Sequence, residues 1–454
     1  MITTTIHLSD ILNSQRIDVA YYKDDSGIND FVSLSKYVDI KGGKRIPKGK
    51  SFTSEDTNYL YLRLSDITDF ECINYSAFKN INEELFNILK RYEIHNNEIA
   101  FSIAGTIGRV FVVKNIPEGK RVILTENCAK LLPKNDSILP EYISLLLNCD
   151  FVQKQIEQNR IQTTIPKIGL DRIAKLKVPR LPSFIVQQEI VEQYQKAQTL
   201  KLKKEQEAKQ ILHEIDNYII DTLGINKCCH EPHGTQLRKV SSLIGERLDV
   251  TFHKNIEDAT KTVKKVTYKS LGEIVEMSTE GWDQKSLFTD VFPYIEISAI
   301  DTVTGIINDI ASIAIDKAPS RAKRILRKND ILISTTRPDR GAICIYNGEN
   351  ISIASTGFSI IRDINDTILR EYLYLILRSS LLLKQMAIRS SGGNYPAITE
   401  SELRKVLIPT PSLDVQKNIV DTIFEMKTKA MKLQEEGDVL FDKAKLQIEK
   451  LILK

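Results

Sequence analysis

The sequence has almost no excess of charge of either sign, because 63 Lys and Arg residues face 59 Asp and Glu residues, giving a formal net charge of +4. No global basic field therefore attracts a polyanion, and a nucleic-acid surface would have to arise from segregated charge. Hydrophobic residues make up 42% and charged residues 27% of the 454 residues, fractions typical of a soluble globular protein. At typical domain sizes, this length predicts two or three domains.

Cysteine and long apolar runs are also scarce. The six cysteines are scattered along the chain, which predicts the reduced thiols of a cytoplasmic protein rather than a disulfide framework. No apolar run approaches the roughly 18 residues needed to cross a membrane. Residues 1–23 lack the basic and apolar regions of a secretory signal. We therefore expect a cytoplasmic protein without a membrane association.

Motifs for nucleotide, metal and methyl-transfer chemistry are missing as well. The sequence contains no Gly-x-x-x-x-Gly-Lys-Ser/Thr loop, no Gly-x-Gly-x-x-Gly turn and no Asn/Asp-Pro-Pro-Tyr/Phe tetrapeptide. Zinc ligands by residue type occur together only at Cys228, Cys229, His230 and His233. Adjacent cysteines fit one tetrahedron poorly and a second ligand pair is absent, so a solvated linker is the better interpretation. We expect no catalytic residues, no metal and no cofactor in this chain.

What the sequence does contain is an internal duplication. Segments of the first half recur in the same order in the second half, at an offset of about 230 residues. The matched pairs are Arg16–Lys23 and Arg247–Lys254, Tyr61–Ile67 and Tyr294–Ile300, Asn97–Ser102 and Asn329–Ser334, Glu141-Tyr142 and Glu371-Tyr372, Lys154-Gln155 and Lys384-Gln385, and Val186–Val191 and Val415–Val420. A repeat with conserved order predicts two copies of one structural unit.

Each repeat shows the same succession of predicted elements. Short β-rich runs such as Tyr59–Leu64 come first. Apolar residues at helical spacing then predict one amphipathic helix over 142–156, and another over 372–386 in the second repeat. Proline-punctuated strands are predicted to follow at 173–179 and 403–409.

Each repeat ends in a long helical segment, at 183–223 and at 412–454, with apolar residues at mixed three- and four-residue steps. Forty helical residues span about 60 Å, and a solvated helix of that length needs a partner for its apolar stripe. We predict that the two helices pack antiparallel as a coiled coil. The predicted stripe of the second helix consists of Ile419, Ile423, Phe424, Leu440, Ala444, Ile448 and Leu451. The alternative is that each helix folds onto its own domain.

Basic residues gather in loops. The segment 41–50 contains five cations and three glycines; glycine lets the backbone approach a ligand closely, and Lys and Arg bind phosphates or guanine edges. The equivalent segment 277–286 has Lys285 as its only cation and contains Trp282, so the loops diverge where the frameworks agree. The candidate DNA-binding residues are Lys41, Lys44, Arg45, Lys48 and Lys50 in the first repeat and Arg321, Arg324, Arg337 and Arg340 in the second. For each cluster the alternative is a solvated turn.

Taken together, these repeated motifs resemble those of the specificity (S) subunit of a Type I restriction-modification system, over nearly the whole chain. The resemblance rests on Arg-Ile/Leu-Asp-Val, Asn-Glu/Asp-Ile, the Glu-Tyr helix, and Gln187 and Gln416 at the start of the long helices. It implies an α+β fold with two tandem-repeated α/β target-recognition domains, separated by two long antiparallel helices that form a coiled-coil stem with pseudo-twofold symmetry. The implied divisions are domain 1 at 1–182, spacer helix 1 at 183–223, a linker at 224–238, domain 2 at 239–411 and spacer helix 2 at 412–454.

The same resemblance implies a non-catalytic subunit that binds an asymmetric bipartite site in double-stranded DNA, with one domain on each half-site. It implies two DNA methyltransferase subunits as partners, which two restriction subunits can join. S-adenosylmethionine, ATP and Mg²⁺ would be bound by those partners only. Two other functions remain open from the residues: a duplicated coiled-coil scaffold that binds proteins, and a self-contained restriction or modification enzyme.

Overall fold

The chain divides into two compact units in the computed structural model, which describes residues 31–67, 73–161, 166–225 and 266–453. Unit 1 comprises residues 1–203 and 436–454, and unit 2 comprises residues 204–435. Each unit thus contains one α/β domain and part of both long helices. The motif pair Arg16–Lys23 and Arg247–Lys254, and the segment with Cys228 and His233, lie outside the described residues.

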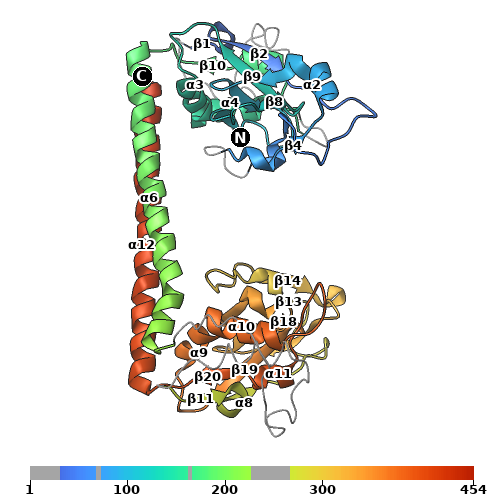
Figure 1. Ribbon diagram of the computed structural model, residues 1–454, viewed down its shortest axis with the longest axis vertical. Helices are drawn as coiled ribbons and strands as arrows, with labels where there is room; N and C mark the ends of the chain where they lie inside the picture. Colours follow the sequence, from blue (N-terminus) through green and yellow to red (C-terminus); the bar gives the residue numbers. More distant parts are fainter. Residues whose placement is uncertain (1–30, 68–72, 162–165, 226–265, 454) are drawn as a thin grey trace, which may run out of the picture. The chain divides into compact units, whose positions relative to one another are not determined.

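Unit 1 is built around two four-stranded sheets (Figure 1). The first has the order β2 (Val38–Gly42), β9 (Cys128–Pro133), β6 (Ile99–Ser102) and β7 (Val110–Val112), with all neighbours antiparallel. The second has the order β4 (Lys79–Asn80), β3 (Tyr59–Leu62), β8 (Arg121–Leu124) and β5 (Glu93–Ile94), in which only β3 and β8 run parallel. A further antiparallel pair joins β1 (Val32–Ser33) to β10 (Lys177–Val178).

Unit 2 repeats this topology strand for strand. Its first sheet has the order β12 (Val275–Met277), β19 (Phe358–Ile364), β16 (Ile331–Ser334) and β17 (Ile343–Ile345). Its second sheet has the order β14 (Ala311–Ala314), β13 (Val291–Ile295), β18 (Ser352–Ser355) and β15 (Ala322–Leu326), and again only the central pair, β13 and β18, is parallel. The pair β11 (Tyr268–Ser270) and β20 (Leu407–Pro409) corresponds to β1 and β10. The repeat in sequence is therefore a repeat in fold.

The connection between the two edge strands of the second sheet differs between the units. Unit 1 places helix α2 (Glu83–Leu89) between β4 and β5, and its Leu85 and Phe86 are buried against the sheet in a cluster with Tyr61 and Ile123. Unit 2 has only a short 3-10 turn, Ile315–Lys317, between β14 and β15. The shared framework thus carries different surface segments.

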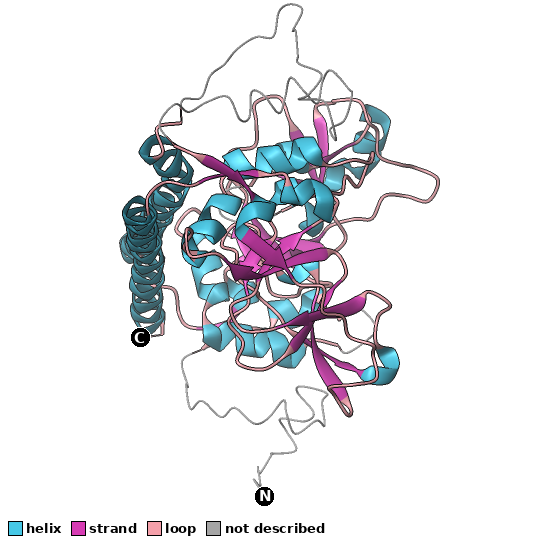
Figure 2. Cartoon of the chain, turned by 90° about the horizontal axis from the view of Figure 1, so that it is seen from below, coloured by secondary structure: helices cyan, strands magenta, loops and turns pink. Residues whose placement is uncertain are grey.

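The structure corrects the single amphipathic helix predicted in each repeat. The predicted helix of unit 1 is two helices, α3 (Pro140–Asn148) and α4 (Asp150–Asn159), with Cys149 extended between them. In unit 2, α9 (Arg370–Leu377) and α10 (Ser380–Arg389) are separated in the same way. Figure 2 shows the short helices of the domains beside their strands. The prediction was wrong because apolar side chains face the core on both sides of the break, so their spacing does not reveal it.

The predicted strands at 173–179 and 403–409 are also shorter than expected. Helices α5 (Leu170–Ala174) and α11 (Glu400–Arg404) occupy the start of these segments, and β10 and β20 follow them. The Thr399 side chain accepts a hydrogen bond from Glu402 N and so begins α11. An N-cap of this kind starts a helical turn even where proline follows soon after.

The two long helices are α6 (Phe184–Thr222) and α12 (Leu413–Ile452), which lie side by side in each unit (Figure 1). In unit 1 the rings of Tyr194 and Phe441 meet edge-on at 5.4 Å, and Lys201 Nζ lies 2.8 Å from a carboxylate oxygen of Asp438. In unit 2, Asn418 Nδ2 donates to the Tyr218 hydroxyl at 3.3 Å. The start of each helix therefore pairs with the end of the other, which confirms the predicted antiparallel arrangement.

The predicted apolar stripe of α12 was wrong in part. Phe424, Leu440 and Leu451 are 71%, 43% and 43% exposed. Ile419, Ile423 and Ile448 of the predicted stripe are buried, and Ala430 and Ile452, which were not predicted, are buried with them. Apolar residues are spread around this helix, so periodicity alone did not identify the face that packs.

Gln187 and Gln416 each fix the start of a long helix by the same set of hydrogen bonds. Gln187 is buried, accepts from Leu139 N at 2.9 Å, and donates to the carbonyl oxygens of Ser137 and Pro182 at 3.1 and 2.9 Å. Gln416 makes the corresponding bonds: it accepts from Leu369 N and donates to the carbonyl oxygens of Thr367 and Pro411. The amide thus ties α6 to the start of α3, and α12 to the start of α9.

We expect Gln187→Leu to lower the free energy of unfolding by about 1–3 kcal/mol, because an apolar side chain of similar size leaves buried backbone groups without partners. Urea unfolding of the full chain measures this change. Gln188→Leu is the matched control, since Gln188 is exposed on the same turn and its loss should leave stability nearly unchanged. Equal effects of the two substitutions would show that the hydrogen bonds of Gln187 do not matter.

Candidate nucleic-acid interface

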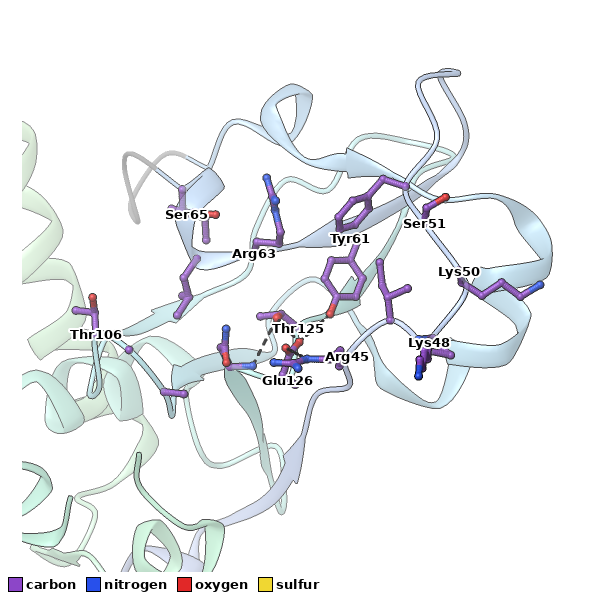
Figure 3. A pocket seen from close by; sticks show the side chains of 18 of the residues that line it. Arg45, Lys48, Lys50, Ser51, Tyr61, Arg63, Ser65, Thr106, Thr125 and Glu126 are labelled. Carbon is purple, nitrogen blue, oxygen red and sulfur yellow. Dashed lines mark hydrogen bonds and ion pairs between the residues drawn. The ribbon is translucent and has the colours of Figure 1, made fainter. Parts of the chain in front are cut away.

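Unit 1 contains an open cleft of about 970 Å³. It is lined by the segments 45–52, 63–65, 104–106 and 125–127, together with side chains that include Tyr61 and Arg109. Figure 3 shows Thr106 on one side and Lys48, Lys50 and Ser51 on the other, with Arg45 and Glu126 between them. Several segments distant in sequence thus converge on one concave, partly basic surface.

A glycine brings the basic loop against the sheet. A Cβ atom at Gly43 would lie 2.0 Å from Thr125 O, so no other residue fits without a backbone shift. Gly43 N donates to Cys128 O at 2.8 Å and Lys44 N to Leu124 O at 3.0 Å. The loop therefore starts at a fixed point beside the turn between β8 and β9.

Arg45 and Glu126 form the central ion pair of the cleft, with Arg45 Nε 2.6 Å from Glu126 Oε1. The other carboxylate oxygen lies 3.0 Å from Thr125 Oγ1 and 3.1 Å from the Tyr61 hydroxyl. Burial acts to raise the pKa of Glu126, but the hydrogen bonds from Arg45, Thr125 and Tyr61 outweigh it and hold that pKa below its usual value. Burial raises the pKa of Tyr61 to about 12. Glu126 is therefore ionised and Tyr61 protonated at neutral pH.

The structure brings only some of the predicted cations of unit 1 into the cleft. Arg45, Lys48 and Lys50 line it, and Lys50 Nζ pairs with Glu84 at 2.6 Å. Lys41 lies on β2 opposite Lys130 of β9, and neither it nor Lys44 is among the lining residues.

Two lining cations were missed by sequence reasoning. Arg63 lies just after β3, binds Asp66 through two hydrogen bonds of 2.8 and 2.5 Å, and stands over the Phe52 ring. Arg109 lies just before β7. Neither belongs to a basic run, although Arg63 falls within the repeated segment that begins at Tyr61.

The segment of unit 2 that corresponds to 41–50 contains a buried aromatic side chain. Trp282 is buried, its indole Nε1 donates to Ser286 O, and its ring packs with those of Phe288 and Phe292. Of the predicted cations nearby, Arg321 is exposed just before β15, and Arg324 is half-buried on that strand. The Nε atom of Arg324 is buried and has no hydrogen-bond partner in the described part of the chain.

Arg337 and Arg340 lie together on the connection between β16 and β17. Arg337 has a left-handed backbone (φ 49°), donates to Asn394 O at 2.6 Å, and places its guanidinium 4.2 Å from the centre of the Tyr395 ring, which is 71% exposed. Its backbone N donates to Pro396 O, just as Gly105 N donates to Pro166 O in unit 1. Gly105 also has a positive φ, of 76°. An arginine thus stands where the other unit has a glycine.

Other cations of unit 2 are bound by carboxylates. Arg327 makes two hydrogen bonds of 3.0 and 2.6 Å to Glu280, which also binds Arg362. Arg362 in turn binds Asp330 at 2.8 Å. This network joins three segments of the unit, so these cations serve the fold.

We expect the network to lose its stabilising effect in acid. Hydrogen bonds from Arg327, opposed by burial and reinforced by Arg362, lower the pKa of Glu280 from 4.5 to about 2. Since the folded state holds this pKa below the unfolded value, the stabilisation is present above pH 4.5 and is lost as the pH falls toward 2. Urea unfolding should therefore show Glu280→Gln to be less stable than the parent at pH 7, with the difference shrinking below pH 4.5. A difference that does not depend on pH would contradict this assignment.

The described residues offer little for catalysis. Within them, no group of three or more His, Cys, Asp or Glu side chains is placed to hold a metal ion. Cys128, Cys149 and Cys344 are buried free thiols, and burial raises the pKa of each to about 12. None of the helices in this part of the chain is long and apolar enough to cross a membrane.

Two matches to the model of one protein family show to which family the chain belongs. The model of the Type I restriction modification DNA specificity domain matches residues 29–213 and, a second time, residues 263–436. The chain belongs to this family. The resemblance inferred from the repeated motifs is thereby confirmed.

Two curated members of the family are similar over part of their length. The Type I restriction enzyme HindI specificity subunit of Haemophilus influenzae is 30% identical over 114 residues, 24% of this chain and 25% of that subunit. The Type I restriction enzyme EcoBI specificity subunit of Escherichia coli is 28% identical over 130 residues, 29% of this chain and 26% of that subunit. The matches thus span about a quarter of the length of these relatives.

A solved structure has the same fold as this chain over nearly its whole length. It concerns complex assembly and conformational transition of the type I R-M system, and one of its chains aligns with a TM-score of 0.55 and 15% identity. The alignment covers 93% of this chain and 96% of that one. The predicted class, α+β with two α/β domains and two long antiparallel helices, is confirmed.

Proposed function

We propose that the chain is the non-catalytic DNA sequence-recognition subunit of a Type I restriction-modification complex. It binds an asymmetric bipartite site in double-stranded DNA, with one recognition domain on each half-site. The domains are residues 1–182 and 239–411, linked by 224–238 and spaced by the helices 183–223 and 412–454. The candidate cations of both domains contact the DNA.

One observation carries this proposal: the two units share their framework and differ in their loops. Strand order, strand direction and the buried glutamine caps are the same. Unit 1, however, has a basic cleft around Arg45. In the corresponding segment of unit 2, Trp282 is packed in a buried cluster. Two equal frameworks suit the twofold geometry of duplex DNA, and unequal loops suit two different half-sequences.

The partners follow from the same proposal. Two DNA methyltransferase subunits dock on the chain, and two restriction subunits can join them. Those partners, not this chain, bind S-adenosylmethionine, ATP and Mg²⁺. The complex acts in the cytoplasm, where it meets DNA.

The proposal is tested by retention of sheared genomic DNA on the full chain assembled with its methyltransferase subunits, at 50 and 200 mM salt. A protein that neutralises 6–10 phosphates loses about 10³–10⁵ in affinity over this range. We expect such a loss, and a single bipartite motif among the retained fragments. A protein-binding scaffold would retain no motif, and a self-contained enzyme would methylate or cut DNA without the partners.

A further inference from the structure

Arg45 is held at one edge of its guanidinium only. Its Nε donates to Glu126 at 2.6 Å, while 79% of the side chain stays exposed. Its two terminal amino groups donate no hydrogen bond to any part of the chain that the structure describes. The group is therefore oriented by the protein and still has donors available to a ligand in the cleft (Figure 3).

The carboxylate that orients Arg45 is itself fixed. Glu126 Oε2 lies within hydrogen-bond distance of Thr125 Oγ1 and of the Tyr61 hydroxyl. The same hydroxyl lies 2.7 Å from Lys44 O, which belongs to the residue before Arg45. The buried tyrosine thus connects the carboxylate and the basic loop, and limits the motion of the ion pair.

Stability does not explain this arrangement. Exposed ion pairs contribute little to folding, because solvent screens their charges. Glu126 would keep its bonds to Thr125 and Tyr61 without Arg45. An arginine that is oriented but exposed points instead to recognition of a ligand.

Three of the neighbouring cations lack this geometry. Arg63 is bound to Asp66 through Nε and a terminal amino group, so this pair of guanidinium donors is already engaged. Lys50 pairs with Glu84. Lys48 is exposed and forms no ion pair with the described residues, but an ammonium group binds phosphate as a point charge and cannot match a flat bidentate acceptor.

The ion pair of Arg45 with Glu126 has no counterpart in unit 2. Tyr294 of β13 stands at the position of Tyr61 of β3. The turn between β8 and β9 is Thr125-Glu126-Asn127, whereas the turn between β18 and β19 is Thr356-Gly357 and carries no acid. Ile123 pairs with Tyr61, and Ile353 pairs with Tyr294. The next strand begins at Cys128 and at Phe358, equally far along the chain in both units, so Thr356 takes the position of Glu126. The ion pair is therefore a feature of unit 1 and not of the repeated framework.

We propose that Arg45 reads a guanine in the half-site bound by unit 1, with Glu126 as its positioning residue. The terminal amino groups donate to O6 and N7 of the guanine in the major groove, the commonest specific arginine contact to DNA. Lys48, on the same loop, binds phosphate and positions the duplex without reading sequence. This assignment rests on the proposed function and names the base and residue that it requires in one half-site.

The test measures binding of the full chain, assembled with its methyltransferase subunits, to duplexes that carry each of the four base pairs at every position of the half-sites. We expect the parent complex to prefer G·C at one position of the first half-site by about tenfold to a hundredfold. Arg45→Lys keeps the charge but loses the fork, so this preference should fall to about threefold or less. Preferences in the other half-site should not change.

Two further variants separate reading from positioning and from general binding. Glu126→Gln should weaken the guanine preference in part, because the amide orients the guanidinium less strongly than the carboxylate does. Lys48→Ala is the control on the same loop and should weaken binding to all four duplexes alike. Each readout is a ratio of affinities, so a loss of folded protein does not alter it, and Arg45→Gln serves as a second variant.

The outcomes separate this inference from the proposed function. If Arg45→Lys and Arg45→Gln both keep the guanine preference, or lose preferences in both half-sites alike, the assignment of Arg45 is wrong. If the parent complex shows no sequence preference at any position, the proposed function itself fails.

Discussion

Seven residues inserted into each long helix, after Lys203 and after Glu435, are expected to widen the gap between the half-sites by about three base pairs. A heptad adds about 10.5 Å and returns each helix to the same face, so the pairing of α6 with α12 continues. B-DNA rises about 3.4 Å per base pair. Both insertions fall where the chain passes between the two units, so contacts within each unit are kept.

Modified-base sequencing of cells that carry the lengthened chain and its methyltransferase measures this effect. The expected motif keeps both half-sequences and has a longer gap, and methylation at the original site is lost. Lengthening one long helix alone by a turn should likewise change the gap without changing the two half-sequences. New half-sequences, or an unchanged gap, would show that the helices do not set the spacing.

Arg337→Gly is expected to weaken recognition of the half-site of unit 2 by about tenfold to a hundredfold, the range for loss of a bidentate base contact. The backbone should tolerate the change well, because Gly105 occupies the corresponding left-handed position in unit 1. A non-glycine residue in that conformation costs on the order of 1 kcal/mol. Relief of this strain offsets the lost interaction with the exposed Tyr395 ring, which contributes about 0.5–1 kcal/mol.

Binding to duplexes varied in each half-site, together with thermal unfolding, measures both effects of Arg337→Gly. We expect the unfolding midpoint to stay within a few degrees of the parent while recognition of one half-site is lost. Arg337→Lys is the charge-matched variant and should retain affinity better than selectivity. A large drop in the midpoint with unchanged base preference would instead make Arg337 a structural residue.

The large features of the fold were predictable because they follow from repetition and local pattern. The motif Asn97-Glu98-Ile99 and its copy mark the same turn in both units, where Asn97 and Asn329 both have positive φ. Gln187 and Gln416 were recognised as matching residues at the starts of the long helices. Their role as buried caps, however, depends on carbonyl groups of distant segments, which no local pattern shows.

The details that were not predictable depend on tertiary contacts. Hydrophobic spacing continues through the break at Cys149, so one helix was predicted where two exist. The helix α12 has apolar residues on all its sides, so Phe424 was assigned to the packed stripe although its side chain is exposed. In the candidate site, the basic run located Arg45, but Glu126 and Tyr61 come from other strands and turns. Which cations are neutralised, as Arg327 is by Glu280, likewise depends on segments that meet only in the fold.

The central claim, that this chain determines which DNA sequence a methyltransferase modifies, is tested most directly by modified-base sequencing of the host genome with and without the gene. We predict that deletion removes methyladenine from one bipartite asymmetric motif and leaves all other methylation unchanged. Re-expression of the chain should restore that motif. An unchanged pattern of methylation, with the methyltransferase partner shown to be expressed, would contradict the account.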